Sequence, residues 1–223
     1  MTEQSVWVVT GAAGTLGQGL VQRALEHGDE CVAIDNDLKG LEALSDLMQA
    51  QGHRPPVIHP IDLVGATLQD LHDTAAAIGE AVGEINHLVH AAGSFKALRP
   101  LLHQPPDEWL ALTQLGIHAP LFLTQSLLER FSGQAHDSIV WVIDSIPLAQ
   151  PAHWGGYGLV QQAKAWMAKT LELELGPKGP RVITWRPKTF YSRISAQAWP
   201  ARGQNDFAEL APQIDELMSM VNN

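Results

Sequence analysis

A glycine-rich turn near the N-terminus constrains the fold of this chain more than any other stretch. An apolar run at residues 6–9 leads into glycines at three-residue intervals, Gly11, Gly14 and Gly17. Apolar residues then return at helical spacing from Leu16 onward. This pattern predicts a strand, a tight turn and a helix.

The turn also predicts what the chain binds. Glycine tolerates positive φ, allows the backbone to approach a phosphate, and allows the helix to pack on the strand. The exposed N–H groups and the helix dipole favour a pyrophosphate. We therefore expect a dinucleotide site that includes Gly11, Gly14, Thr15, Leu16 and Gly17. The alternative is a helix-entry turn that binds nothing.

A second strand, at residues 31–35, ends in an acid. Asp35 lies eighteen residues after Gly17, close to the ~20 expected for the group that holds a ribose 2′-hydroxyl. A carboxylate at this position repels a 2′-phosphate, so the sequence predicts NAD rather than NADP. Asp37 is a second candidate for the role, and for both acids the alternative is a solvated turn.

Length and composition narrow the class of protein. The chain of 223 residues fits a single domain, with residues 191–223 as a C-terminal loop and helix extension. A net charge of −10 argues against nucleic acid or an anionic membrane as a partner. No apolar run reaches the ~18–20 residues of a membrane span, and residues 1–5 do not resemble a signal peptide. We expect a cytoplasmic protein, with Cys31 in the core and no metal site.

Strand and helix signals alternate along the rest of the chain. We predict helices over 38–51, 65–83, 107–131 (kinked at Pro120), 156–175 and 206–221 (interrupted at Pro212), and further strands over 57–62, 85–93, 138–143 and 181–185. This alternation predicts an α/β Rossmann fold, a doubly wound parallel sheet of about six strands in the order 3-2-1-4-5-6. A ligand then lies at the carboxyl ends of the strands.

The motifs, taken in order, resemble those of the short-chain dehydrogenases/reductases over about residues 5–195. Residues 10–17 resemble the opening motif of that family, and residues 90–93 resemble its Asn-Asn-Ala-Gly motif with both asparagines replaced. Ser145 and Tyr157 match the catalytic serine and tyrosine. The resemblance implies that the cofactor also contacts Asp62, Leu63, Ala91, Ala92, Gly93 and Pro187.

The catalytic set departs from the family in ways that affect the chemistry. In the family, a lysine four residues after the tyrosine lowers the tyrosine pKa, and an asparagine in the preceding long helix positions a water. Here these positions are Gln161 and Gly116, and the turn glycine after Pro187 is Lys188. A free tyrosine titrates near about 10, so turnover should be slow at neutral pH. Lys164 lies about 11 Å along the helix from Tyr157, and we interpret it as a solvated or interface lysine.

The resemblance implies an NAD(P)-dependent oxidoreductase that acts on a small-molecule alcohol or carbonyl, with Ser145, Tyr157 and Gln161 as the catalytic positions. An apolar substrate pocket could be lined by Trp154, Phe190, Tyr191 and Trp199. The alternative is a catalytically silent dinucleotide-binding scaffold or redox-sensing interaction protein. In that case the serine and tyrosine make only structural hydrogen bonds.

The family usually dimerises through its two long helices, which here are residues 107–131 and 156–175. The second of these carries more apolar positions than one stripe against a sheet requires. The strand that contributes to the tetramer interface in the family, the seventh, has no candidate in this sequence. We therefore expect a homodimer whose C-terminal helix covers the site or the open sheet edge.

Overall fold

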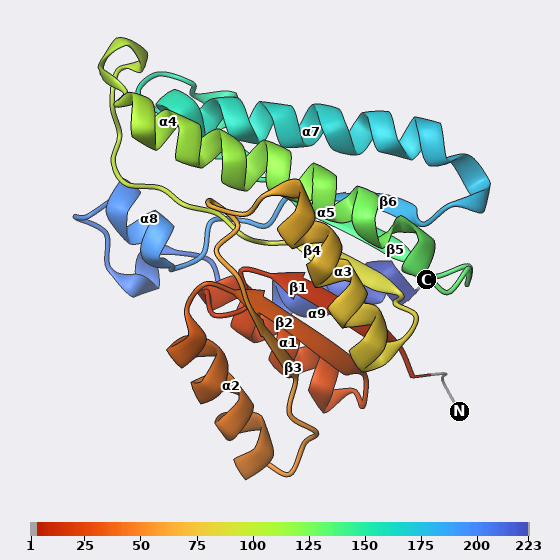
Figure 1. Cartoon of the computed structure of the whole chain (residues 1–223). Helices are drawn as coiled ribbons and strands as arrows, with labels where there is room; N and C mark the ends of the chain where they lie inside the picture. The colour runs from red at the N-terminus through yellow and green to blue at the C-terminus, as the bar shows by residue number, and fades with distance from the viewer. Residues whose placement is uncertain (1–3, 223) are drawn as a thin grey trace.

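The computed structural model describes residues 4–222, and its centre is one six-stranded parallel sheet (Figure 1). The strand order is β3-β2-β1-β4-β5-β6, which confirms the predicted topology. The strands are β1 Val6–Thr10, β2 Glu30–Asp35, β3 Val57–Pro60, β4 His87–His90, β5 Ser138–Val142 and β6 Arg181–Trp185. The expectation about a signal peptide concerns residues 1–5, of which residues 1–3 lie outside this description.

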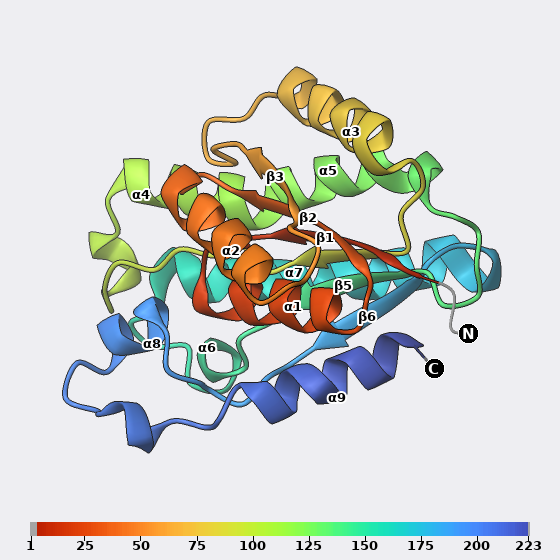
Figure 2. The ribbon, with the colours of Figure 1, turned by 90° about the horizontal axis from the view of Figure 1, so that it is seen from below.

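Helices cover both faces of the sheet (Figures 1 and 2). One face is covered by α1 Thr15–Glu26, α2 Leu38–Ala50 and α9 Ala211–Asn222; the other is covered by α3 Leu68–Val82, α4 Pro106–Thr113, α5 Ala119–Leu127 and α7 Gly155–Leu175. Trp7 and Val9 of β1 enter the core under α1, whereas Val8 enters the core under α3 and α5. Burial on both faces explains why the strand is apolar without alternation.

The predicted helix over 107–131 is divided. A π-helical turn at Gln114–His118 separates α4 from α5. The N–H that Pro120 lacks would donate to the carbonyl of Gly116, the central residue of this π turn, so the irregular turn lies where a proline at 120 disrupts the helix. The disruption predicted at Pro120 is therefore present, in the form of a π turn.

The C-terminal helix starts later than expected. α9 begins at Ala211, and Pro212 lies in its first turn instead of interrupting the helix. The Arg181 guanidinium donates a hydrogen bond to the Val221 carbonyl at 2.7 Å, which ties α9 to the edge strand β6. α9 thus covers the sheet beside α1 (Figure 2), and it does not cover the pocket described below.

The predicted helix over 107–131 ends in a 3-10 turn, Leu128–Arg130. Short helices outside the predicted ranges complete the fold: α6 Ile146–Ala149, α8 Arg193–Ala198 and the 3-10 turns Leu101–His103, Gly176–Lys178 and Gln204–Asp206, the last of which meets the predicted C-terminal helix only at residue 206. Within residues 4–222 the sheet has no seventh strand. We also find, in that part of the chain, no helix with the length and apolar character needed to cross a bilayer.

Candidate functional site

A cavity of about 470 Å³ opens at the carboxyl ends of the strands. Its walls come from the glycine turn, the ends of β2 and β4, one face of α7, and the segment after β6. The cavity brings together every position predicted to bind the cofactor: Gly11, Gly14, Thr15, Leu16, Gly17, Asp35, Asp62, Leu63, Ala91, Ala92, Gly93 and Pro187. This is the place where an open α/β sheet binds its ligand.

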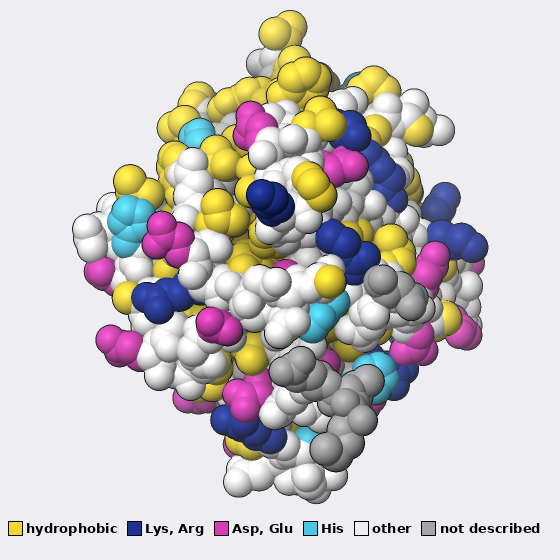
Figure 3. All heavy atoms as spheres, turned by 90° about the vertical axis from the view of Figure 1, so that its right-hand side faces the viewer, with side chains coloured by type: hydrophobic (Ala, Val, Ile, Leu, Met, Phe, Trp, Pro, Cys, Tyr) yellow, Lys and Arg dark blue, Asp and Glu magenta, His cyan; other side chains and the backbone are white. Residues whose placement is uncertain are grey.

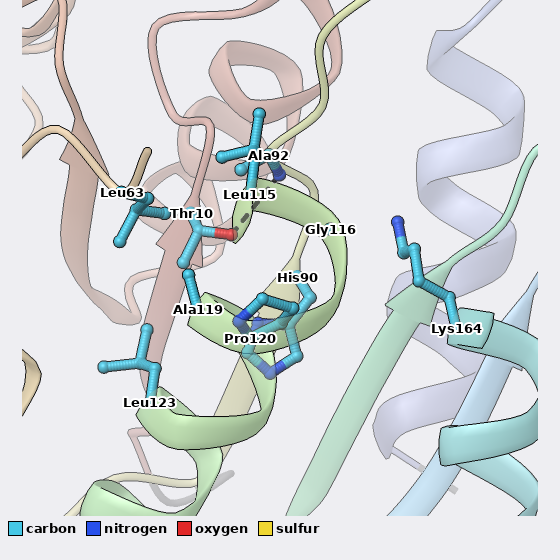
Figure 4. Close-up of a pocket in the computed structure, with 10 residues that line it drawn as sticks. All are labelled: Thr10, Leu63, His90, Ala92, Leu115, Gly116, Ala119, Pro120, Leu123 and Lys164. Carbon is cyan, nitrogen blue, oxygen red and sulfur yellow. Dashed lines mark hydrogen bonds between the residues drawn. The ribbon is translucent and has the colours of Figure 1, made fainter. Parts of the chain in front are cut away.

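The glycine turn is packed too closely for any side chain. A Cβ atom on Gly17 would lie 2.1 Å from the Gly11 carbonyl oxygen, and one on Gly11 would lie 2.7 Å from the Ala92 Cα. Gly11 also has a φ of 72°, in the region that favours glycine. Thr10 Oγ1 accepts a hydrogen bond from the Ala92 N–H at 3.3 Å (dashed in Figure 4). The turn is thus held against the loop after β4 with its backbone facing the cavity.

Two carboxylates line the end of the cavity next to β2. Asp35 Oδ2 accepts a hydrogen bond from the Ala13 N–H at 3.0 Å, and Oδ1 accepts one from the Asp37 N–H at 3.0 Å. Asp37 in turn caps α2 by accepting from the Gly40 N–H. The lysines and arginines that line the cavity lie elsewhere, on α7 and after β6: Lys164, Lys188 and Arg193. Among the residues that line the cavity, the β2 end thus carries two carboxylates and none of these cations.

Tyr157 lies in the cavity as predicted, but its partner is not Ser145. The Tyr157 hydroxyl donates a hydrogen bond to Asp144 Oδ2 at 3.3 Å. The other Asp144 oxygen accepts from the Ile146 N–H at 2.9 Å, and the Asp144 N–H donates to Gln161 Oε1 at 2.9 Å. Ser145 does not line the cavity, whereas Asp144 does. The expectation that Ser145 faces Tyr157 is therefore corrected to Asp144.

The pair of Asp144 and Tyr157 opposes ionisation of the phenol. Burial raises the pKa of Tyr157 well above its ordinary value, and the charge and hydrogen bond of Asp144 raise it further. Burial also raises the pKa of Asp144, although hydrogen bonds from Ile146 and Tyr157 and the charge of Lys164 oppose this shift. Tyr157 is consequently a phenol that donates a hydrogen bond, with no phenolate near neutral pH.

The interpretation of Lys164 as a solvated or interface residue is wrong. Lys164 is only 5% exposed and lines the cavity, on the face of α7 that also carries Tyr157 and Gln161. Burial lowers the pKa of Lys164 to about 8, although the Asp144 carboxylate opposes this. No carboxylate of the described residues forms an ion pair with it within 4.0 Å. The site thus holds a buried cation that lacks a close partner.

A second cavity of about 10 Å³ lies beside Lys164 and Gly116. This is about the volume that one water occupies. In Figure 4, Lys164 extends from α7 on the side opposite to Thr10 and Leu63. His90 lies between them; its Nε2 bonds to Thr124 Oγ1 at 2.8 Å, and its buried Nδ1 has no hydrogen-bond partner among residues 4–222. Burial lowers the pKa of His90 to about 3, with Lys164 contributing, so the ring is neutral.

Packing explains why Gly116 carries no side chain. A Cβ atom there would lie 2.2 Å from Val160 Cγ1 on α7. Because Val160 is buried, it has little room to move. The asparagine of the family therefore does not fit at this position without a change at Val160.

Aromatic rings surround the Tyr157 end of the cavity. Phe95 lies 5.3 Å from the Tyr157 ring centroid, and Trp154 lies 5.8 Å from it. Trp199 packs edge-on against Trp154 at 5.7 Å. Two of the aromatic residues expected to line a substrate pocket, Phe190 and Trp199, line the cavity. Trp154 packs on Tyr157 and Tyr191 packs on Phe207, and neither of these two lines the cavity.

Comparison with known proteins decides the family. Residues 5–203 match the family model described as short chain dehydrogenase. The chain belongs to the short-chain dehydrogenase family. A relative in this family, 2,3-dihydroxy-2,3-dihydro-p-cumate dehydrogenase of Pseudomonas putida, is 28% identical over 222 residues, covering 98% of this chain and 81% of that protein.

Solved short-chain dehydrogenase structures share the fold. One from Salmonella enterica serovar Typhi CT18 has a TM-score of 0.92 at 21% identity, covering 98% of this chain and 90% of that chain. One from Escherichia coli CFT073, complexed with NADPH, has a TM-score of 0.89 at 22% identity, covering 97% of this chain and 90% of that chain. At these identities the likeness concerns the fold alone.

Sequence reasoning missed Asp144 and misinterpreted Lys164, although both positions carried a signal. Asp144 ends a strand and stands three residues before Pro147, which is typical of a helix start. An aspartate at such a position often accepts a hydrogen bond from the backbone N–H two residues later. Lys164 follows Tyr157 by seven residues and therefore shares its helix face. A lysine on a buried stripe is rare unless it has a function.

Proposed function

We propose that this short-chain dehydrogenase is an NAD(P)-binding oxidoreductase acting on a small molecule. The observation that carries the proposal is the joint presence, in one cavity, of the glycine turn, the acidic end of β2 and Tyr157. The backbone cradle that no Cβ could enter at Gly11 and Gly17 fits a pyrophosphate. When bound, the dinucleotide supplies the hydride donor or acceptor.

NAD is the cofactor that this proposal favours over NADP. Two solved short-chain dehydrogenases of this fold are complexed with NADP or NADPH, which counts against this preference. The support comes from the charges of this chain, because Asp35 and Asp37 both line the end of the cavity next to β2. A 2′-phosphate placed there would face two carboxylates.

Each polar residue of the site has a distinct part in the proposal. Tyr157 and Asp144 lie together at the reacting group of the substrate, with the Tyr157 hydroxyl donating its hydrogen bond to Asp144 Oδ2. Gln161 fixes the Asp144 backbone through its bond to the Asp144 N–H. Lys164 supplies the cation that Gln161 does not, from a position seven residues after Tyr157. A small-molecule alcohol or carbonyl is the substrate class that the family resemblance suggests.

Turnover tests this proposal against the scaffold alternative. The purified protein would be screened with NADH and NAD against carbonyl, imine, alcohol and amine compounds, in parallel with Tyr157→Phe. Turnover that falls at least tenfold in Tyr157→Phe supports the enzyme, because this variant removes the hydroxyl that holds Asp144 in the cavity. Dinucleotide binding with no turnover of any compound would favour the catalytically silent scaffold.

We also propose a homodimer through α4 and α7. Large apolar side chains are exposed on these helices: Leu110 at 66%, Leu159 at 43%, Trp166 at 76% and Leu173 at 70%. Figure 3 shows apolar side chains gathered at the top of the molecule, where Figure 1 places α4 and α7. An isologous dimer would cover such a surface. We further propose a cytoplasmic location.

A further inference from the structure

We propose that the reacting group of the substrate is a nitrogen base, and that the pocket reduces or forms the C=N bond of an iminium ion with the Asp144 carboxylate as its counter-charge. The inference rests on the proposed oxidoreductase function and names the substrate class for the same site. It departs from the alcohol or carbonyl substrate that the family resemblance suggests. The contacts of Asp144 and Tyr157 determine which charge the site favours.

The Asp144 carboxylate is able to accept another strong donor. It lines the cavity, and no Lys, Arg or His nitrogen of residues 4–222 lies within 4.0 Å of it. Its Oδ1 accepts from the Ile146 N–H, whereas Oδ2 accepts only the long 3.3 Å bond from Tyr157. Each carboxylate oxygen accepts two hydrogen bonds. A charged N–H group is the donor that gains most from such a site.

The same arrangement does not suit the reduction of a carbonyl group. Protonation of a developing alkoxide by Tyr157 would leave a phenolate 3.3 Å from the Asp144 carboxylate. Two negative charges at that distance in a partly buried site repel one another strongly. An oxyanion held between them would meet the same repulsion. The site favours positive charge at the position where carbonyl reduction develops negative charge.

Iminium chemistry needs no proton from Tyr157. The iminium carbon accepts a hydride, its π-electron pair moves to nitrogen, and a neutral amine forms; the hydride comes from a reduced nicotinamide dinucleotide, which is oxidised. In the opposite direction the neutral amine loses a hydride from carbon and becomes the iminium ion. Asp144 stabilises the protonated C=N nitrogen, because an adjacent anion favours the charged form. Tyr157 stays a phenol and orients Asp144.

The aromatic rings around the site also favour a cation. Trp199 and Tyr157 both line the cavity, and aromatic faces attract positive charge. The Arg202 guanidinium, which does not line the cavity, lies 5.3 Å from the Trp199 ring centroid. A ligand that pairs an amine or iminium nitrogen with an apolar ring would use both the carboxylate and these aromatic faces.

The other charged groups of the cavity leave room for such a ligand. Lys164 is deep in the pocket and favours the ionised form of Asp144 without pairing with it closely. Lys188 and Arg193 are exposed at the margin of the cavity. His90 lies near Lys164 and is neutral because of its burial. Asp144 is thus the carboxylate that a cation beside Tyr157 would meet.

Binding of two ring compounds of the same shape tests the inference without relying on turnover. 1,2,3,4-Tetrahydroisoquinoline carries an ammonium group where isochroman carries an ether oxygen. In calorimetric titrations of the protein saturated with NAD, we expect the ammonium compound to bind roughly tenfold or more tightly than isochroman. Asp144→Asn keeps the acceptor for Ile146 and should remove this preference. Asp73→Asn, which removes an exposed charge on α3, should preserve it.

Turnover of 3,4-dihydroisoquinoline and of 1-tetralone with NADH separates this inference from the proposed function. Reduction of the C=N compound, abolished in Asp144→Asn, supports both. Reduction of the ketone alone, or an amine preference that survives Asp144→Asn, overturns the inference and leaves the oxidoreductase standing. Asp144-dependent amine binding with no turnover supports the nitrogen-base site and counts against the oxidoreductase. If Asp144→Asn melts well below the unaltered protein, Asp144→Ser replaces it.

Discussion

Replacing the buried lysine should make this protein more stable. Lys164 has a pKa of about 8 in the folded chain, against an ordinary value of 10.5. Below pH 8, keeping Lys164 charged therefore destabilises the folded state by about 3 kcal/mol, at 1.36 kcal/mol per pKa unit. Lys164→Met keeps the length of the side chain and removes the charge. We expect Lys164→Met to raise the free energy of unfolding by about that amount at pH 7.

The pH dependence of this gain follows from the sign of the shift. Between pH 8 and 10.5 the unfolded chain binds a proton at Lys164 that the folded chain has lost. The stability of the unaltered protein should therefore rise over this range. In Lys164→Met that rise is absent, and the difference between the two proteins fades toward pH 10.5. Urea unfolding at several pH values measures both quantities.

A matched control and a binding assay complete the test. Lys169→Met alters an exposed lysine of α7, with a side chain 62% exposed and paired with Glu172, and should change stability by less than about 0.5 kcal/mol. Lys164→Met should weaken NADH binding at least tenfold, because the cation faces the cavity. A loss of stability at pH 7, or an unchanged pH dependence, would refute the reasoning about Lys164.

Three further outcomes follow from the structure. Gly116→Ala should destabilise the protein by about 1–3 kcal/mol through its clash with Val160. In a double-mutant cycle followed by urea unfolding, adding Val160→Ala should recover most of that loss; effects of the two changes that add within about 0.5 kcal/mol would contradict the contact. Asp35→Ser should reduce the difference in affinity between NADH and NADPH in titrations. Equal affinity of the unaltered protein for both dinucleotides would contradict the role given to Asp35. Trp166→Glu should yield monomers in light scattering, and a variant that stays dimeric would place the interface elsewhere.

The parts of the fold that periodicity determines could be predicted from the sequence. The strand order and the positions of β6 and α7 follow from apolar runs alternating with helical spacing, and the structure confirms them. Pro120 indicated where the long helix is disrupted, because the π turn at Gln114–His118 contains the carbonyl that its missing N–H leaves without a helical donor. The close packing of Gly116 against Val160 could not be predicted, because it depends on a contact between two helices that no local pattern encodes.

The candidate site divides in the same way. The glycine turn and Asp35 could be placed because they follow directly from strand ends. The choice between Asp144 and Ser145 could not, because it depends on the direction of the backbone in two residues after β5, where side chains no longer alternate. Lys164 was within reach of helical geometry, but its burial depends on how the surrounding helices and loops enclose it.

Calorimetric titration with NADH measures whether the cavity at the carboxyl ends of the strands holds a nicotinamide dinucleotide. Gly17→Ala is the control, since its Cβ atom would lie 2.1 Å from the Gly11 carbonyl oxygen. We predict one site per chain, filled by NADH more tightly than by NADPH and lost in Gly17→Ala. Failure of the unaltered protein to bind either dinucleotide would contradict the account.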